Sequence, residues 1–175
     1  MFKKRIKPAS YYAALYNKMK YIVPVGDMKI GQIPDILVAD ALGSCLCLTA
    51  YDPVSQVGGL LHAMLPLSKV NLQKAAVNPY MFVDTGIPAL FEALLEHGFE
   101  KDHSAVKAVG CGNPMGSREV FKIGERNYSV LQEILVKEGV CLAAEDVGGT
   151  ASRAVQLDLA SGHTIISSNG TKRVL

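Results

Sequence analysis

Apolar and polar residues follow one another in short runs, and the first third of the chain reads as a series of strands. Apolar runs typical of buried strands cover 21–25, 36–38, 45–51 and 56–64. A turn at Asp52-Pro53 separates the last two runs, so we expect them to pair as a hairpin. Residues 26–35 begin with a Gly-Asp turn and are mostly polar, which predicts a connecting segment without regular structure.

Two later segments have the spacing of helices. Apolar residues recur every three or four positions over 84–97, with Asp84 or Thr85 as the expected cap and Gly98 after the last turn. We expect this segment to be a core helix. A second helical pattern covers 126–138.

The last third of the chain returns to strands. Strand patterns cover 140–144, 155–159 and 164–167, and Gly148-Gly149 marks a turn that needs backbone freedom. Strands and helices therefore occur in separate blocks, and many strands must pair across long separations. The expected fold class is α+β, in one domain.

Composition and charge limit the possible functions. The chain has 175 residues, 49% of them hydrophobic, which is enough for one substantial core. It has no apolar run of about 20 residues, the length that spans a bilayer, and its N-terminus lacks the pattern of a signal peptide. We therefore expect a cytoplasmic protein without an integral membrane segment.

The positive charge lies at the N-terminus. Residues 1–20 contain six basic residues and no acid, which leaves 12 basic and 16 acidic residues in 21–175. We divide the chain into a basic extension, 1–20, and a domain, 21–175. Four residues of the extension at helical spacing, Tyr12, Leu15, Tyr16 and Met19, predict a short amphipathic helix. Such a terminal segment usually packs on the domain or frays in solvent, and binding to an acidic partner or a membrane surface is the alternative. Nucleic acid ranks last, because the tyrosines do not form a stacking platform.

The candidate chemistry begins at Leu42-Gly43-Ser44-Cys45, where a thiol follows a turn of small residues. Such a turn lets a substrate approach and can direct backbone N–H groups at a developing oxyanion. Cys47 shares a strand face with Cys45, but a small buried hydrophobe is the simpler interpretation for it.

His62 lies on the next predicted strand. A single histidine on an apolar strand is more often a core residue than a catalyst. The predicted hairpin changes this balance, because it would bring His62 beside Cys45, as in thiol hydrolases. The four cysteines (Cys45, Cys47, Cys111, Cys141) lack the spacing of a zinc site, so we expect free thiols and no metal.

These residues and five ordered motifs resemble the chemoreceptor glutamine deamidase family, CheD. The motifs are Gly43-Ser44-Cys45 with Asp52-Pro53, His62 with Met64-Leu65-Pro66, Phe82-Val83-Asp84, Ile123-Gly124-Glu125-Arg126-Asn127, and the segment 144–153. The resemblance covers about 21–167, nearly all of the chain beyond the basic extension.

The resemblance implies a layered, β-sandwich-like core flanked by helices. It also implies hydrolysis of specific glutamine side chains on the cytoplasmic helical region of methyl-accepting chemotaxis receptors, a step in signal transduction. Cys45 would be the nucleophile, its thiolate favoured by an adjacent imidazolium, and His62 the general base and acid. The backbone N–H groups of Ser44 and Cys45 would hold the oxyanion. Thiol and imidazole supply all the chemistry, so no cofactor is expected.

Two positions depart from the family pattern. The family's threonine six residues before the cysteine, which orients the histidine, is Ala39 here. Asp40 would point to the opposite strand face, so we expect a backbone carbonyl, that of Ala39, to orient His62. Gly116 replaces an exposed phenylalanine of the family, which weakens the case for a CheC-type phosphatase as partner.

Two interpretations remain open. One is a working deamidase. The other is a catalytically weak adaptor that binds receptors or the phosphatase, and Ala39 favours it. Gly43 is expected to support the site, and Asp146 and Arg153 form either an ordinary solvated pair or a brace for the site.

Overall fold

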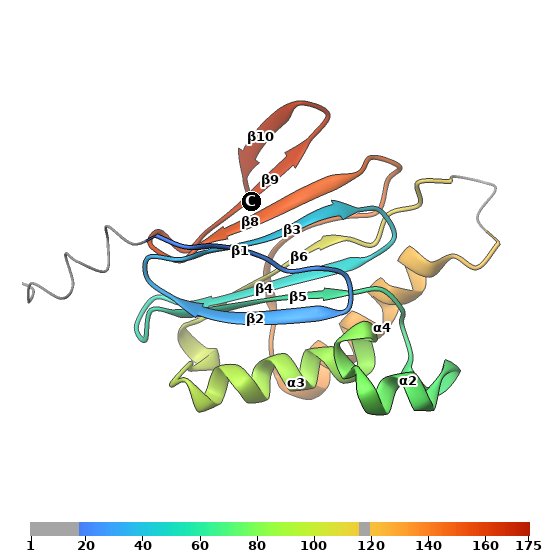
Figure 1. Cartoon of the computed structure of the whole chain (residues 1–175), viewed down its shortest axis with the longest axis horizontal. Helices are drawn as coiled ribbons and strands as arrows, with labels where there is room; N and C mark the ends of the chain where they lie inside the picture. Colours follow the sequence, from blue (N-terminus) through green and yellow to red (C-terminus); the bar gives the residue numbers. More distant parts are fainter. Residues whose placement is uncertain (1–17, 116–119) are drawn as a thin grey trace, which may run out of the picture.

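The computed structural model describes residues 18–115 and 120–175. Gly116 and most of the predicted N-terminal helix lie outside the described residues. The described chain folds into two five-stranded sheets and a set of helices. Figure 1 shows the two sheets stacked on each other, with the long helices on one side of the stack.

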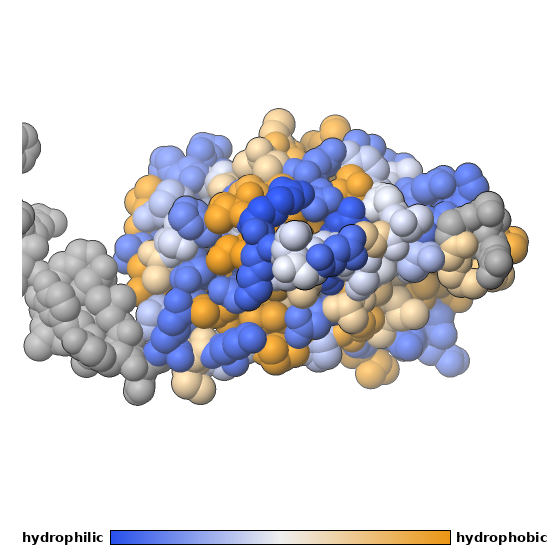
Figure 2. Space-filling view, turned by 90° about the horizontal axis from the view of Figure 1, so that it is seen from above, coloured by the Kyte–Doolittle hydropathy of each residue, from blue (hydrophilic) through white to orange (hydrophobic). Residues whose placement is uncertain are grey.

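The outer sheet is the one farther from the helices. Its strands, in spatial order, are β1 (Lys20–Ile22), β3 (Ile36–Leu42), β8 (Arg153–Asp158), β9 (His163–Ser168) and β10 (Thr171–Val174). Along β8, buried and half-buried residues alternate, as expected for a strand with one face in the core. Seen from above in Figure 2, the molecule on this side mixes hydrophilic and hydrophobic side chains.

The central sheet lies between the outer sheet and the helices. Its strands, in spatial order, are β2 (Asp27–Gln32), β5 (Val57–Ala63), β4 (Leu46–Asp52), β6 (Ala105–Gly110) and β7 (Leu142–Val147). All residues of β4 and β5 are buried, because both faces of these strands are covered. The predicted hairpin is confirmed: β4 and β5 pair antiparallel, with Cys47 opposite His62.

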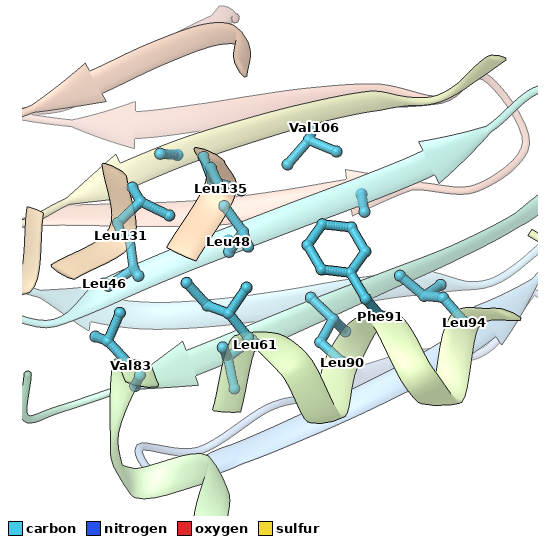
Figure 3. Packing of buried hydrophobic residues seen from close by; sticks show 14 of the residues in the cluster. Leu46, Leu48, Leu61, Val83, Leu90, Phe91, Leu94, Val106, Leu131 and Leu135 are labelled. Atoms are coloured by element: carbon cyan, nitrogen blue, oxygen red, sulfur yellow. The ribbon is translucent and has the colours of Figure 1, made fainter. Parts of the chain in front are cut away.

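The helices complete the third layer. They are the α-helices α2 (Leu72–Val77), α3 (Val83–Glu96) and α4 (Ile123–Glu138), with short 3-10 turns η1 (Ser68–Val70), η2 (Pro79–Met81) and η3 (Lys101–His103). Figure 3 shows side chains of α3 and α4, such as Leu90, Phe91 and Leu131, packed on Leu48 and Leu61 of the central sheet. A second apolar cluster lies between the sheets and includes Leu37, Leu60 and Leu157. The expected layered α+β fold is therefore present.

Three features of the secondary structure differ from the sequence-based expectation: a strand, a helix cap and the start of a helix. The segment 26–35 contains β2, which escaped prediction because only part of each side chain is buried along this edge strand. The cap of α3 is Phe82, whose side chain makes no capping bond. Asp84 instead accepts hydrogen bonds from the backbone N and Oγ of Ser68, which fixes the preceding loop. The helix α4 begins at Ile123, three residues earlier than expected.

A bulge interrupts β3 close to the candidate site. The pairing with β8 shifts register between Ala39 and Leu42, and Ala41 has a φ of 58°. A non-glycine residue rarely adopts this left-handed conformation. Beyond Ala39, successive side chains of β3 therefore do not follow the regular alternation between the two faces of a strand.

Candidate active site

Cys45 lies in the bend between β3 and β4, and the backbone of this bend is held from three directions. The carbonyl of Gly43 accepts a hydrogen bond from the N–H of Gly112 (2.8 Å), and that of Cys45 accepts one from Cys111 (2.7 Å). The carbonyl of Ser44 accepts one from the side-chain amide of Asn127 (2.9 Å). The turn of small residues is therefore a fixed platform for the thiol.

A glycine is required where β6 ends beside this platform. Gly110 has a φ of 102°, and a Cβ atom there would overlap the carbonyl oxygen of Cys45. Any other residue would push the bend away. The close approach lets the backbone that follows Gly110 bond to the bend.

His62 lies on β5, one strand away, and only 1% of it is exposed. Its Nδ1 is 3.2 Å from the carbonyl oxygen of Val23. A carbonyl can only accept a hydrogen bond, so in the neutral ring Nδ1 carries the proton and Nε2 is the basic nitrogen. Nε2 is buried and has no hydrogen-bond partner among the described residues. The hydrogen bond of Nδ1 thus orients the imidazole, and Nε2 has a free lone pair that can accept a proton.

Cys45, one residue before β4, packs on the face of the central sheet that faces the outer sheet, and His62 on β5 lies opposite Cys47. Cys47, two residues after Cys45, pairs with His62 and packs between the sheets. Cys45 packs against the same cluster. Residues placed diagonally on neighbouring strands have Cα atoms about 7–8 Å apart, within reach of an imidazole. The register of the hairpin favours the predicted pairing of Cys45 with His62, and no hydrogen bond joins the two side chains within the described chain.

Both groups are uncharged near neutral pH. Burial raises the pKa of the Cys45 thiol, and its own backbone N–H offsets only part of this effect. Burial lowers the pKa of His62, and the Val23 carbonyl and the Asp40 carboxylate offset this only partly. The resting pair is a thiol beside a neutral imidazole. This differs from the expected thiolate and imidazolium, because burial penalises both charges.

The other two thiols near the bend belong to the core. Cys47 is fully buried, as expected for a small hydrophobe, and burial raises its pKa strongly. Cys111 is also buried, and its pKa rises to about 12. All four cysteines are free, as predicted, but Cys45 combines partial exposure with a neighbouring histidine.

The backbone group that orients the histidine is not the expected one. The bonded carbonyl belongs to Val23, in the segment between β1 and β2, and not to Ala39. Ala39 is fully buried in the cluster between the sheets and pairs with Val155. Nδ1 of His62 is therefore hydrogen-bonded to a backbone carbonyl, where the family resemblance predicts a threonine hydroxyl.

Asn127 is a functional residue whose role the sequence pattern does not predict. It is fully buried, and its Nδ2 donates to Ser44 and also to the carbonyl of Met64 (3.0 Å). The sequence signal is a polar residue within the apolar stripe of a helix, which includes Leu131 and Leu135. The backbone N–H groups of Ser44 and Cys45 are the expected donors to an oxyanion. Neither donates a hydrogen bond to the backbone of another residue of the described chain.

Asp146 and Arg153 form a partly buried pair and not a solvated one. Asp146 is on β7 and Arg153 on β8, so the pair joins the two sheets, with Nη2 2.9 Å from Oδ1. Only 9% of the Arg153 side chain is exposed. Arg173 also bonds Asp146, at its other oxygen. Arg153 pairs with Leu42, the last residue of β3, which places the ion pair close to the bend that carries Cys45.

No group of three or more histidine, cysteine or acidic side chains in the described ranges 18–115 and 120–175 is arranged to hold a metal ion. No helix among these residues is long and apolar enough to cross a bilayer.

Comparison with known proteins gives consistent matches. The family profile described as "CheD chemotactic sensory transduction" matches residues 64–168. A protein of Solibacter usitatus named "Probable chemoreceptor glutamine deamidase CheD" is 44% identical over 155 residues, 88% of this chain and 92% of its own length. Similarly named proteins of Syntrophus aciditrophicus and Anaeromyxobacter dehalogenans are 39% and 42% identical, over 85% and 83% of this chain and 94% and 92% of their own lengths.

Proposed function

Since the chain belongs to the CheD family, we propose that it is a chemoreceptor glutamine deamidase that uses Cys45 as nucleophile and His62 as general base and acid. One observation carries the assignment of roles. The Val23 carbonyl bonds Nδ1 of His62, which leaves Nε2 as the basic nitrogen, and Cys47 opposite His62 lies only two residues after Cys45. A base in this position can take the proton of the thiol.

The reaction begins from the neutral pair. Nε2 of His62 takes the proton of Cys45 as Sγ attacks Cδ of the substrate glutamine, and a tetrahedral oxyanion forms. The N–H groups of Ser44 and Cys45 would hold this oxyanion, since neither donates to the backbone of another described residue and that of Cys45 already faces its own Sγ. The protonated His62 then gives its proton to the leaving nitrogen, and ammonia departs from a thioester.

The second half of the reaction uses the same groups in reverse. His62 takes a proton from water, whose oxygen attacks the thioester carbonyl, and the proton returns to Sγ as the C–S bond breaks. The product is a glutamate side chain and the enzyme returns to the thiol. These steps need no metal or organic cofactor, because thiol and imidazole supply the nucleophile and every proton transfer.

Three further residues support the site in this proposal. Gly43 lets the bend pack against Pro114 and bonds Gly112 through its carbonyl. Asp146 and Arg153 fix the sheets relative to each other beside the bend. Removing Asp146 would leave the charge of Arg153, of which only 9% is exposed, without its acidic partner, whereas Asp146 would keep Arg173 if Arg153 were removed.

The substrate in this proposal is the cytoplasmic helical region of methyl-accepting receptors, and the enzyme acts in the cytoplasm. Residues 21–175 are the deamidase domain in this proposal, and 1–20 are a basic extension whose last residue, Lys20, begins β1. A CheC-type phosphatase is a further proposed partner. The competing proposal is a catalytically weak adaptor, and the observation that favours it is Ala39, which carries no hydroxyl to bond the histidine.

Deamidation can be measured directly. We would incubate the protein with the cytoplasmic fragment of a cognate receptor and follow the mass gain of about 1 Da that accompanies conversion of an amide to an acid. Cys45→Ala should abolish the conversion. Cys47→Ala is the matched control, because it removes a thiol from the same sheet face without touching the bend. Equal conversion by wild type and Cys45→Ala would refute the proposed chemistry, and no conversion by the wild type would leave the adaptor.

A further inference from the structure

Asn127 is a buried polar residue at the start of α4. The buried stripe of this helix consists of Gly124, Asn127, Val130, Leu131 and Leu135. Gly124 lets the first turn approach closely, since a Cβ there would overlap the carbonyl oxygens of Cys111 and Gly112. The close approach brings the side chain of Asn127 against the site.

The carboxamide of Asn127 joins the two halves of the site. Its Nδ2 is 2.9 Å from the carbonyl of Ser44, the residue before the nucleophile. The same nitrogen is 3.0 Å from the carbonyl of Met64, two residues after His62. A carbonyl only accepts, so both N–H bonds of the amide are used, and the orientation of the side chain is fixed by its partners.

The two hydrogen bonds of Asn127 lie where the pairing between β4 and β5 ends. Pairing between β4 and β5 begins at Leu46 opposite Ala63. One step further along, Cys45 would lie opposite Met64, and no such pair is formed. Asn127 thus ties the strands together at the open end of the hairpin, next to the thiol and the imidazole.

We propose that Asn127 is a positioning residue that sets the separation of Cys45 and His62 by bonding the backbone on both sides of the pair. The proposal rests on the proposed deamidase function and extends it. The side chain of Asn127 does not touch the reacting atoms. Without it, the bend retains its bonds to Gly112 and Cys111 but loses its direct tie to the strand of His62.

The test compares two substitutions on the same buried stripe. Asn127→Leu removes both donors and keeps a similar volume. Leu131→Ala, one turn along, removes packing from the same stripe without touching either carbonyl. Deamidation of a receptor fragment is measured under conditions where thermal melts show each variant to be folded. Asn127→Ala replaces Asn127→Leu if the larger side chain prevents folding.

We expect kcat of the Asn127 variant to fall on the order of 100-fold, because misplacement of reacting groups by about 1 Å has such an effect. KM should stay close to that of the wild type. Folded Leu131→Ala should keep the wild-type kcat. An unchanged kcat in the Asn127 variant, or an equal loss in Leu131→Ala, would overturn the positioning role.

A second measurement separates this proposal from the proposed function. The alkylation rate of Cys45, followed by peptide mass spectrometry, reports the environment of the thiol without any substrate. Release of the bend should raise this rate in Asn127→Leu and leave it unchanged in Leu131→Ala. If the wild type fails to deamidate but alkylation responds in this way, the deamidase function fails and the positioning of the bend stands. If alkylation is the same in all three proteins, the positioning role fails.

Discussion

Both faces of β4 and β5 are buried against apolar side chains, but only one of them also carries the candidate catalytic residues. The face toward the helices carries residues such as Leu46, Leu48 and Leu61, which pack with α3 and α4 (Figure 3). The face toward the outer sheet carries Cys47 and His62, with Cys45 packed against it. Both faces of these strands therefore contribute to the core, but only the face toward the outer sheet carries candidate catalytic groups, so Leu61 and His62 should respond differently to substitution.

The largest effect should come from the histidine. His62→Gln removes the basic nitrogen but keeps an amide that can donate to a carbonyl such as that of Val23. Loss of a general base costs about 10²–10⁴-fold in rate, so kcat for deamidation should fall within this range. The receptor-fragment assay measures it, and thermal melts check the fold. Activity close to that of the wild type would remove His62 from the mechanism.

The adjacent residue should change stability and not chemistry. Leu61 is fully buried on the helix-facing side. Leu61→Ala should lower the free energy of unfolding by about 2–5 kcal/mol, measured by urea denaturation. The folded fraction should keep its kcat. A lower kcat in the folded variant would show that the two faces are not independent.

Acid should weaken the fold through His62. Burial holds the pKa of this side chain below its usual 6.5, so the unfolded chain takes up a proton at a higher pH than the folded one. Stability is therefore present above about pH 6.5 and is lost as the pH falls through the folded pKa. The melting temperature of the wild type should drop between about pH 7.5 and about pH 5.5, and that of His62→Gln should drop less. Equal drops would place the acid sensitivity elsewhere.

The smallest effect on activity should follow restoration of the family's threonine. Ala39 is fully buried, and the Val23 carbonyl already bonds Nδ1 of His62. Ala39→Thr should leave kcat nearly unchanged while destabilising the fold by about 1–3 kcal/mol through overpacking. A large gain in kcat, measured in the same assay, would show that the Val23 bond is an inadequate substitute and would favour the weak-adaptor interpretation for the natural chain.

The sequence was informative where a local pattern determined the structure. The hairpin that brings Cys45 and His62 together follows from two apolar runs and a turn at Asp52-Pro53, and its pairing is as predicted. The sharing of one face by Cys45 and Cys47 follows from strand alternation. The helix over 84–97 was displaced by only one residue from α3.

Features that depend on distant backbone atoms could not be predicted. The carbonyl that bonds His62 belongs to Val23, 39 residues earlier, and a backbone oxygen has no sequence signature. The strands β6 and β10 were missed, as was the bulge at Ala41, where an alanine adopts a left-handed conformation. The expected thiolate and imidazolium also run against the directions of the two pKa shifts, because burial raises the pKa of Cys45 and lowers that of His62 and a sequence pattern does not show burial of this kind.

The pH dependence of Cys45 alkylation tests most directly whether the catalytic pair is neutral at rest. The rate would be measured for the wild type and His62→Gln, with mass spectrometry separating Cys45 from the exposed Cys141. Since burial raises the pKa of Cys45 above its usual 9.0, the rate should stay low near neutrality and rise only in alkaline solution in both proteins. A fast, flat rate near neutral pH that is lost in His62→Gln would reveal a thiolate and imidazolium pair and contradict this account.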